Sequence, residues 1–301
     1  MEDAEYDTYE IYTTSREYTG TFTALEQGQI HKVYRGQARD CIRELTLSLD
    51  HDALQEEEKG MNEHPDLTKA LEKRQDISRY SRWIYNNIRP FIKIRVLDIG
   101  SGTGNMVRFF FEEDLEIIAA TDIFESQIET MKKRFGDKKN FFPFLFDISR
   151  DDCSALAEYG FDTITCINVL EHIEDDLLAL VRMKEIIEHK GRIVLLVPAL
   201  SWIFGTMDKA CGHCRRYDRH DMDRLARKAG LEIIYKQFMN PMGIIPWFIK
   251  GRILRKMSTF SETLDKRSSF IINAVSAVLE KGEKIIRPPA GISQITVMEK
   301  P

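Results

Sequence analysis

Short apolar runs separated by amphipathic stretches dominate the chain after residue 90. The runs lie at 94–100, 116–122, 140–147, 161–168, 192–198, 231–238 and 293–299. Most of the segments between them carry apolar residues at helical intervals. Strands that alternate with helices are typical of a mostly parallel sheet with helices on both faces. We therefore predict an α/β domain built on a doubly wound sheet.

The N-terminal part follows a different pattern. The first 34 residues contain five of the ten tyrosines without a helical period, and we interpret them as an arm with some strand character. From Ala38 to about Ile88 the pattern is helical and charged, with one break at His64-Pro65-Asp66. We predict that residues 1–78 form an arm and a helical extension that caps the substrate, ahead of a main domain at 79–301.

The last two predicted strands are separated by roughly residues 239–292, which is much longer than an ordinary connection. Its apolar residues recur at helical spacing in several stretches. We predict that this segment is an inserted helical lid.

A strand that runs into three glycines gives the sharpest signal for a ligand. The run ending at Ile99 continues as Gly100-Ser101-Gly102-Thr103-Gly104. Alternating glycines allow a tight turn and a close approach of the backbone to a ligand. Asn105 stands where the dinucleotide-binding fingerprint has its third glycine. Asp98, two residues before the loop, would repel a pyrophosphate but can hold a cationic amino group.

Two more acids follow at the ends of the next strands. Asp122 lies 24 residues after Asp98, where an acid can accept from both hydroxyls of a ribose. Asp147 ends the third strand and can accept from the exocyclic amine of adenine. Each acid alone could be a helix cap or a solvated loop residue. In this order they fit a ligand with an ammonium group, a ribose and an adenine but no phosphate, which is S-adenosylmethionine.

The sequence resembles the class I S-adenosylmethionine-dependent methyltransferases over about residues 80–300. "VLDIGSGTG", "ATD" and "FDTITCINVLEHIEDD" look like their first, second and fourth motifs, with Ser101 where many members have cysteine. The resemblance implies a Rossmann-like seven-stranded sheet whose last strand is antiparallel, and S-adenosyl-L-homocysteine as product. The cofactor site that it implies consists of Asp98, Gly100, Ser101, Gly102, Gly104, Asn105, Asp122, Ile123, Asp147, Ile148 and Asn168.

A narrower resemblance covers residues 197–254 and 283–300. These segments are similar to bacterial methyltransferases of glycan, lipid-linked sugar or secondary-metabolite pathways. The substrates of that subgroup are diverse, so the resemblance narrows the architecture more than the reaction.

Two histidines are candidates for a general base on the acceptor side of the sheet. Ligands of open α/β sheets bind beyond the carboxyl ends of the strands, and His172 follows the fourth strand there. His213 lies in a polar loop after the fifth strand and is the first candidate. Imidazole suits proton removal near neutrality, although each histidine could instead have a structural role.

The residues around His213 supply candidates for acceptor binding. Arg215 and Arg216 could recognise an anion in a bidentate way, or form salt bridges with acids close in sequence such as Asp208. Tyr217 could position a hydroxyl as a catalytic group or pack under the loop. Three apolar side chains complete the predicted acceptor site: Trp202, Phe204 and Met207.

The pair Cys211 and Cys214 has the C-x-x-C spacing of redox and zinc sites. A structural zinc site needs a second pair of ligands, and no other cysteine or histidine cluster with that spacing occurs. Five cysteines, an odd number in a long chain, also argue against a disulfide framework. We therefore expect no metal site.

The charge balance restricts the partners. The 43 Lys and Arg residues against 48 Asp and Glu residues give a net charge of −5, and without a basic stripe this disfavours nucleic acid. No apolar run approaches the ~18 residues of a membrane span. We expect a cytoplasmic monomer or homodimer. Residues 242–256 combine Trp247 and Phe248 with basic side chains, which leaves peripheral membrane contact open.

These observations favour methyl transfer from S-adenosylmethionine to a small-molecule acceptor, on an oxygen of an anionic, natural-product or sugar-type metabolite. Three alternatives stay open. The acceptor could be a lipid-linked sugar or a prenyl phosphate at a membrane surface. The protein could instead be an NAD-dependent oxidoreductase, or a non-catalytic partner that only binds the cofactor.

Overall fold

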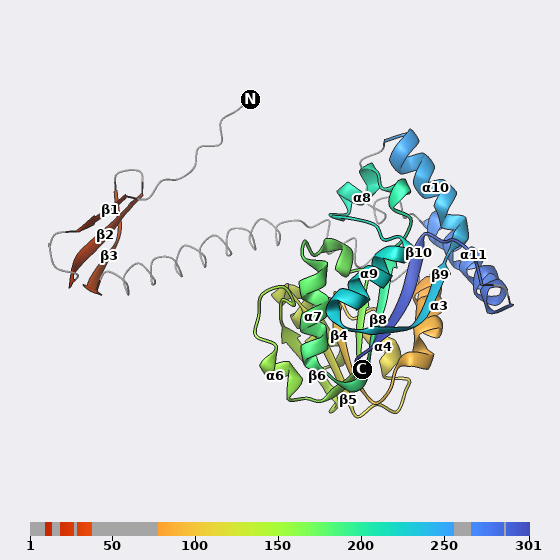
Figure 1. Cartoon of the computed structure of the whole chain (residues 1–301), viewed down its shortest axis with the longest axis horizontal. Coiled ribbons are helices and arrows are strands. Elements are labelled where there is room, and N and C mark those ends of the chain that lie inside the picture. The colour runs from red at the N-terminus through yellow and green to blue at the C-terminus, as the bar shows by residue number, and fades with distance from the viewer. Residues whose placement is uncertain (1–9, 14–18, 27–28, 38–77, 256–265, 286) are drawn as a thin grey trace. The chain divides into compact units, whose positions relative to one another are not determined.

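The computed structural model of the protein describes residues 10–13, 19–26, 29–37, 78–255, 266–285 and 287–301. The chain divides into two compact units, Met1–His64 and Pro65–Pro301 (Figure 1). Cys41 and most of the predicted helical extension lie outside the described residues. Its last part is confirmed as helix α3 (Ser78–Ile88), which ends in the short helix η1 (Arg89–Phe91) at Pro90.

The first unit contains a three-stranded antiparallel sheet of β1 (Glu10–Thr13), β2 (Thr19–Glu26) and β3 (Gln29–Gln37). Threonine is frequent in these strands, and tyrosine and isoleucine recur, as expected for residues that favour extended backbone. The strand character predicted for the tyrosine-rich arm is therefore confirmed. Its role as a substrate cap stays a prediction.

The second unit is built on a seven-stranded sheet with the order β6-β5-β4-β7-β8-β10-β9. Its strands are β4 (Arg95–Ile99), β5 (Ile117–Asp122), β6 (Phe141–Leu145), β7 (Phe161–Ile167), β8 (Ile187–Pro198), β9 (Glu232–Met239) and β10 (Ser293–Glu299). Strands β4 to β8 are parallel where they pair, and β10 is antiparallel to both β8 and β9. The predicted doubly wound sheet with an antiparallel last strand is confirmed.

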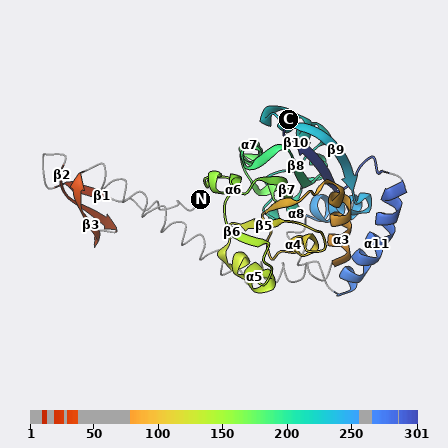
Figure 2. The ribbon, with the colours of Figure 1, turned by 90° about the horizontal axis from the view of Figure 1, so that it is seen from below.

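Helices cover both faces of this sheet (Figure 2). One face is packed by α3, α4 (Val107–Phe110), α5 (Glu125–Phe135) and α11 (Lys266–Ile285). The other is packed by α6 (Ser154–Ala157), α7 (Asp176–Ile186) and α9 (Arg219–Ala229). In the described part of the chain, no helix is long and apolar enough to cross a membrane.

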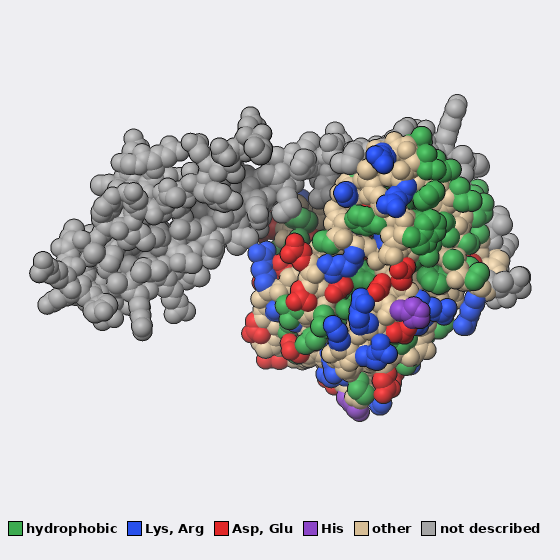
Figure 3. All heavy atoms as spheres, turned by 45° about the horizontal axis from the view of Figure 1, so that its top comes forward, with side chains coloured by type: hydrophobic (Ala, Val, Ile, Leu, Met, Phe, Trp, Pro, Cys, Tyr) green, Lys and Arg blue, Asp and Glu red, His purple; other side chains and the backbone are tan. Residues whose placement is uncertain are grey.

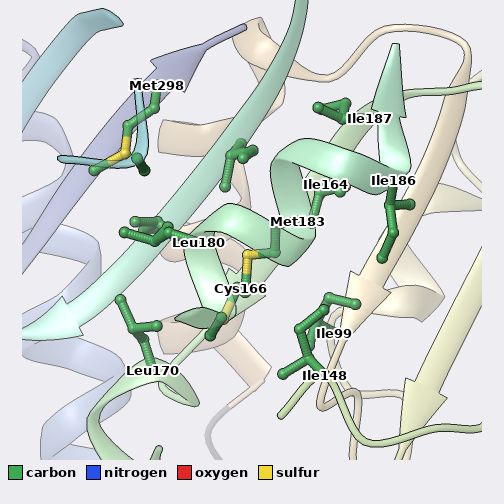
Figure 4. Close-up of a cluster of buried hydrophobic side chains, with 14 of the residues drawn as sticks. Ile99, Ile148, Ile164, Cys166, Leu170, Leu180, Met183, Ile186, Ile187 and Met298 are labelled. Atoms are coloured by element: carbon green, nitrogen blue, oxygen red, sulfur yellow. The ribbon is translucent and has the colours of Figure 1, made fainter. Parts of the chain in front are cut away.

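The core under α7 shows why the central strands are apolar along their whole length. Leu180 and Met183 of α7 pack against Ile164 and Cys166 of β7, and all four side chains are fully buried (Figure 4). The opposite face of the sheet is buried against a second cluster that contains Trp83 of α3. Burial of each large apolar side chain contributes roughly 1.5–3 kcal/mol, so continuous apolar runs are stabilised from both faces.

Helix α4 is shorter than the sequence pattern predicts. The stretch Asn105–Glu113 has helical periodicity, but the α-helix is limited to Val107–Phe110. Glu112, Glu113 and Asp114 follow directly, and acidic side chains at a carboxyl-terminal helix end oppose the helix dipole. The glycine loop therefore leads into a single helical turn.

The segment between β9 and β10 is helical in its described part, as predicted. It contains η4 (Pro241–Gly243), α10 (Ile244–Phe248), the π-helix η5 (Ile249–Ile253) and α11. Helix α11 lies beside α3, where Asn86 Nδ2 donates to Glu280 Oε1 at 2.7 Å. Glu283 accepts from the backbone N–H of Asn240 at 3.0 Å, and burial raises its pKa to about 7.

Candidate active site

The glycine loop after β4 requires glycine at two positions. Gly100 has a φ of +67°, and a Cβ there would lie 2.5 Å from Val169 Cγ2. Gly104 has a φ of +78°, and its Cβ would lie 2.6 Å from Phe135 Cε2. Side chains other than glycine are strained in this backbone region and would clash with both neighbours. The loop is therefore packed between the end of β7 and helix α5.

Asp98 lies almost fully buried at the end of β4. Its Oδ1 accepts from Thr165 Oγ1 of β7 at 2.5 Å. Burial raises the pKa of Asp98 to about 6, and the nearby negative charge of Asp122 adds to the effect. A cationic group beside this carboxyl would favour its ionised form. The site therefore suits the ammonium group of a ligand.

Asp122 at the end of β5 connects that strand to the loop. Its Oδ2 accepts from Gly102 N at 2.7 Å, and its Oδ1 from Phe124 N at 3.1 Å. Burial raises the pKa of Asp122 despite these hydrogen bonds. The next side chain, Ile123, is 46% exposed, so an apolar surface lies directly beside a buried carboxylate. This pair fits a ribose next to a flat ring.

Asp147 and Ile148 follow β6. Asp147 Oδ1 accepts from Ser149 N at 2.8 Å, and its Oδ2 lies 2.9 Å from Arg150 Nε. Ile148 is buried in the core. Asp147 thus belongs to a turn with an ion pair. A ligand amine at this position would share the Asp147 carboxylate with Arg150.

Two loop atoms are buried polar atoms with no hydrogen-bond partner in the described part of the chain. They are Asn105 Oδ1 and Thr103 Oγ1. Unsatisfied buried polar atoms are rare unless a ligand or water pairs them. Asn168, after β7, has a φ of +55°, which asparagine tolerates better than most residues, and its N–H donates to Leu196 O at 2.8 Å. The residues present therefore fit S-adenosylmethionine.

Asp208 of α8 (Thr206–Ala210) organises the acceptor side. Its Oδ1 accepts from Arg216 Nε at 2.6 Å and lies 3.1 Å from His213 Nδ1. Its Oδ2 accepts from Trp247 Nε1 at 3.1 Å. We call Asp208, His213, Arg216 and Trp247 the Asp208 cluster. Burial raises the pKa of Asp208, but the hydrogen bond from His213 and the charge of Arg216 outweigh burial, so the net pKa lies below its usual value.

The structure brings the two candidate bases together although 41 residues separate them. The rings of His172 and His213 lie with centroids 5.0 Å apart in an edge-to-face arrangement. A carboxylate and a carbonyl oxygen can only accept, so His213 Nδ1 donates to Asp208 and His172 Nδ1 donates to Gly212 O at 3.1 Å. In both rings the lone pair is then on Nε2.

Arg215, Arg216 and Tyr217 have internal partners. Arg215 pairs with Asp176 at 2.8 Å. Arg216 forms the salt bridge with Asp208, which is one of the pairs that the sequence offered as an alternative to anion binding. Tyr217 is buried, its hydroxyl lies 3.1 Å from Asp176 Oδ2, and burial raises its pKa. These contacts favour structural roles for Arg216 and Tyr217 over direct acceptor binding.

The three apolar candidates differ in exposure. Trp202 of η3 (Ser201–Ile203) is 55% exposed, with its ring 5.5 Å from that of Phe248. Phe204 is half-buried, whereas Met207 is buried and lies close to Gly251 of η5. Trp202 is the member of this set that offers most surface to a ligand.

Cys211 and Cys214 lie beside the histidine pair. Cys211 is half-buried and Cys214 is exposed, and Cys214 Sγ donates to His172 O at 3.7 Å. The two cysteines do not form a disulfide. The prediction that they bind no metal is not decided by this geometry.

The sequence analysis missed the central role of Asp208 and the contribution of Trp247. Asp208 is named there only as a salt-bridge partner, and Trp247 only as a residue for peripheral membrane contact. The available signal was an acid directly after the mostly apolar stretch 202–207, five residues before His213. The contact from Trp247 spans 39 residues and leaves no local pattern.

The comparisons with known proteins agree with this fold and site. The family model described as a methyltransferase domain matches residues 54–236, more than half of the chain. A Mycobacterium tuberculosis protein named as a probable fatty acid methyltransferase is 30% identical over 112 residues, which cover 36% of this chain and 24% of that protein. The match thus spans about a quarter of the length of that relative.

Two solved structures are among those similar to this chain. One is the complex between the Haloferax volcanii Trm112 methyltransferase activator and a methyltransferase, with 13% identity, a TM-score of 0.52, and coverage of 77% of this chain and 94% of that chain. The other is an Archaeoglobus fulgidus S-adenosylmethionine-dependent methyltransferase, with 17% identity, a TM-score of 0.46, and coverage of 73% and 94%. The family sets aside the oxidoreductase and the non-catalytic alternatives. The chain belongs to the methyltransferase-domain family and is an enzyme.

Proposed function

We propose that the enzyme transfers the methyl group to an oxygen of a small-molecule acceptor, with His213 as the group that receives the proton. The observation that carries this proposal is the 3.1 Å contact between His213 Nδ1 and the buried Asp208 carboxylate. It fixes the tautomer in which Nε2 can accept a proton, and the negative charge of Asp208 stabilises the imidazolium that results.

The carboxyl edge of β4 to β7 would supply the cofactor contacts. Asp98 and the loop from Gly100 to Gly104 would hold the methionine part, and Asp122 with Ile123 the ribose and the adjoining ring. Asp147 and the backbone of Ile148, whose side chain is buried in the core, would lie at the adenine, and Asn168 would lie at the methionine end. When bound, the cofactor supplies a methyl group that is already activated by its positive sulfur.

The chain's own residues then have three tasks: alignment, water exclusion and proton removal. A bond forms between the acceptor oxygen and the methyl carbon while the bond from that carbon to sulfur breaks, and its electron pair stays on sulfur. The hydroxyl proton goes to His213 Nε2. An acceptor that is already ionised, such as a carboxylate, would need no base.

A second candidate function is methylation of an amphiphilic acceptor at a membrane surface. Large apolar side chains are exposed along the insertion, with Ile245 at 67%, Ile253 at 61% and Leu254 at 55%. Figure 3 shows hydrophobic side chains gathered on this side of the molecule, with basic side chains nearby. Exposed Arg252 of η5 adds positive charge to the same segment. Such a surface suits the interface of an anionic membrane, and the matched relative is named for a lipid substrate.

One labelling experiment separates the two candidates. The purified enzyme is incubated with methyl-deuterated S-adenosylmethionine and a metabolite extract that has been split into aqueous and lipid fractions. A product in the aqueous fraction with the label on oxygen supports the first candidate. Label confined to the lipid fraction supports the second, and label on nitrogen or carbon contradicts transfer to oxygen.

A further inference from the structure

Three potential metal ligands converge beside the carboxyl end of β7. Glu171, His172 and His213 each place one ligand atom within 4.8 Å of the other two. Glu171 and His172 belong to the short helix η2 (Leu170–His172), and His213 lies in the loop after α8. Cys214 N donates to Glu171 O at 2.8 Å, so a backbone hydrogen bond holds the two segments together.

The histidines are oriented as metal-binding histidines commonly are. Such a histidine donates one ring N–H to a carboxylate or a carbonyl and binds the metal through the other nitrogen. His213 donates to Asp208, and His172 donates to Gly212 O. Each ring therefore keeps Nε2 as the nitrogen that can bind an ion, and one nitrogen of each ring lies within 4.8 Å of a Glu171 carboxylate oxygen.

The local charge also favours a cation. The carboxylates of Glu171 and Asp208 are both fully buried. The negative charge of each favours the charged form of Arg216, which forms the salt bridge with Asp208. With neutral histidines, the four groups of Glu171, Asp208, Arg216 and His213 carry a net charge of −1. Buried negative charge is costly unless a positive charge offsets it.

We propose that Glu171, His172 and His213 bind one divalent transition-metal ion such as Zn²⁺. Two imidazoles and one carboxylate are a ligand set that such ions accept while keeping positions open for another ligand. Ligand atoms lie about 2.0–2.2 Å from zinc, so the side chains must draw together by roughly 1 Å. His172 can make this movement because its side chain is exposed and lies on a single helical turn.

The use of the ion rests on the proposed function. At this position it would bind the hydroxyl oxygen of the acceptor and lower the pKa of that hydroxyl. The proton would then leave to water before methyl transfer, and His213 would act as a ligand instead of receiving the proton. Binding of the ion itself does not depend on the cofactor or on the acceptor.

The test is a titration of the chelator-treated full chain with Co²⁺ and with Zn²⁺, without cofactor or acceptor. Visible absorption follows Co²⁺, and competition with a chromophoric chelator follows Zn²⁺. We expect one ion per chain, and at least an order-of-magnitude loss of affinity in Glu171→Gln and in His172→Ala. His220→Ala is the matched control because that side chain is 98% exposed on α9, and it should bind as the unmodified protein does.

Two outcomes would overturn the metal site. One is the absence of saturable binding to the unmodified chain. The other is binding that survives Glu171→Gln and His172→Ala but disappears when Cys211 and Cys214 are both changed to Ser, which would assign the ion to the thiols. Failure of the metal site is separable from failure of the proposed base, because loss of turnover in His213→Ala without any metal binding would leave His213 as the proton acceptor.

Discussion

The two ends of the carboxyl edge of the sheet are built in different ways. At the β4 and β5 end, the functional groups are strand-end acids and a glycine loop, and they contact one another through hydrogen bonds from loop N–H groups to a carboxylate, such as that from Gly102 N to Asp122 Oδ2. At the β7 and β8 end, the buried Asp208 carboxylate accepts from side chains of two separate segments, the loop with His213 and Arg216 and helix α10 with Trp247. The residues of the β4 and β5 end can be recognised from local sequence motifs, whereas those of the β7 and β8 end come together only when the chain folds.

This difference separates the tasks of the two ends. The proposed cofactor residues lie at strand ends and in one loop, so a local motif can specify their site. The residues of the acceptor end come from α8 and the loop after it and from α10, which lie far apart in the chain. Substitutions at the acceptor end should therefore change mainly turnover and the free energy of unfolding, whereas those at the cofactor end should change mainly cofactor affinity.

His213→Ala should have the largest effect on turnover. Removal of the proton acceptor should lower kcat by about 10²–10⁴-fold, while the affinity for S-adenosylhomocysteine stays near that of the unmodified enzyme. Turnover assays and calorimetric titration measure the two quantities, with His220→Ala as control. A loss of cofactor affinity equal to the loss of turnover would contradict the assignment of His213 to the acceptor end alone.

Asp208→Ala should be the most destabilising change at the acceptor end. It leaves the Arg216 guanidinium, whose side chain is 1% exposed, without its carboxylate. Breaking a buried ion pair in this way costs about 3–5 kcal/mol of the free energy of unfolding. Urea unfolding measures the cost. Asp137→Ala, whose side chain is 74% exposed, should cost less than about 1 kcal/mol, and equal costs for the two variants would refute a central role for Asp208.

Asp122→Ala should act mainly on the cofactor. It removes the acceptor of the Gly102 and Phe124 N–H groups together with the proposed ribose contact. Hydrogen bonds to charged groups contribute about 1.5–3 kcal/mol, so affinity should fall by roughly 10–100-fold. Calorimetric titration with S-adenosylhomocysteine measures it, and kcat at saturating cofactor should change far less. Unchanged affinity would contradict the proposed position of the ribose.

The pH dependence of cofactor binding should report on Asp98. Its pKa of about 6 means that it is protonated below that pH and then offers no charge to an ammonium group. Affinity should therefore rise by up to about tenfold per pH unit as pH increases towards 6, and should level off above it. The affinity of Asp98→Asn should be weak and nearly independent of pH in this range. The same slope in both proteins would exclude Asp98 as its source.

The Asp98 carboxyl also makes the stability of the protein depend on pH, and this dependence is opposite in sign to that of cofactor affinity. The folded pKa is raised above the unfolded value of ~3.9, so the cofactor-free protein loses stability as pH rises from about 4 to 6. The loss is of order 3 kcal/mol and is absent below both pKa values, where the carboxyl is protonated in either state. Cofactor binding should recover part of it.

The sequence predicted the sheet and the cofactor end because both have short-range patterns. Apolar runs identify β4 to β10, and the glycine loop with Asp98 and Asp122 occupies fixed positions at strand ends. The acceptor end could not be predicted in the same way. The approach of His172 to His213 and of Trp247 to Asp208 depends on how two connections fold over the sheet, and a helical pattern alone does not determine that.

The hydrogen bond from Trp247 to Asp208 ties the insertion to the acceptor side. The same carboxylate orients His213, so the imidazole and helix α10 share one acceptor. A substitution that displaces α10 would take one donor away from the carboxylate that holds the imidazole in place. The packing of the insertion and the orientation of the proposed proton acceptor are thereby coupled through a single side chain, although α10 lies outside the sheet.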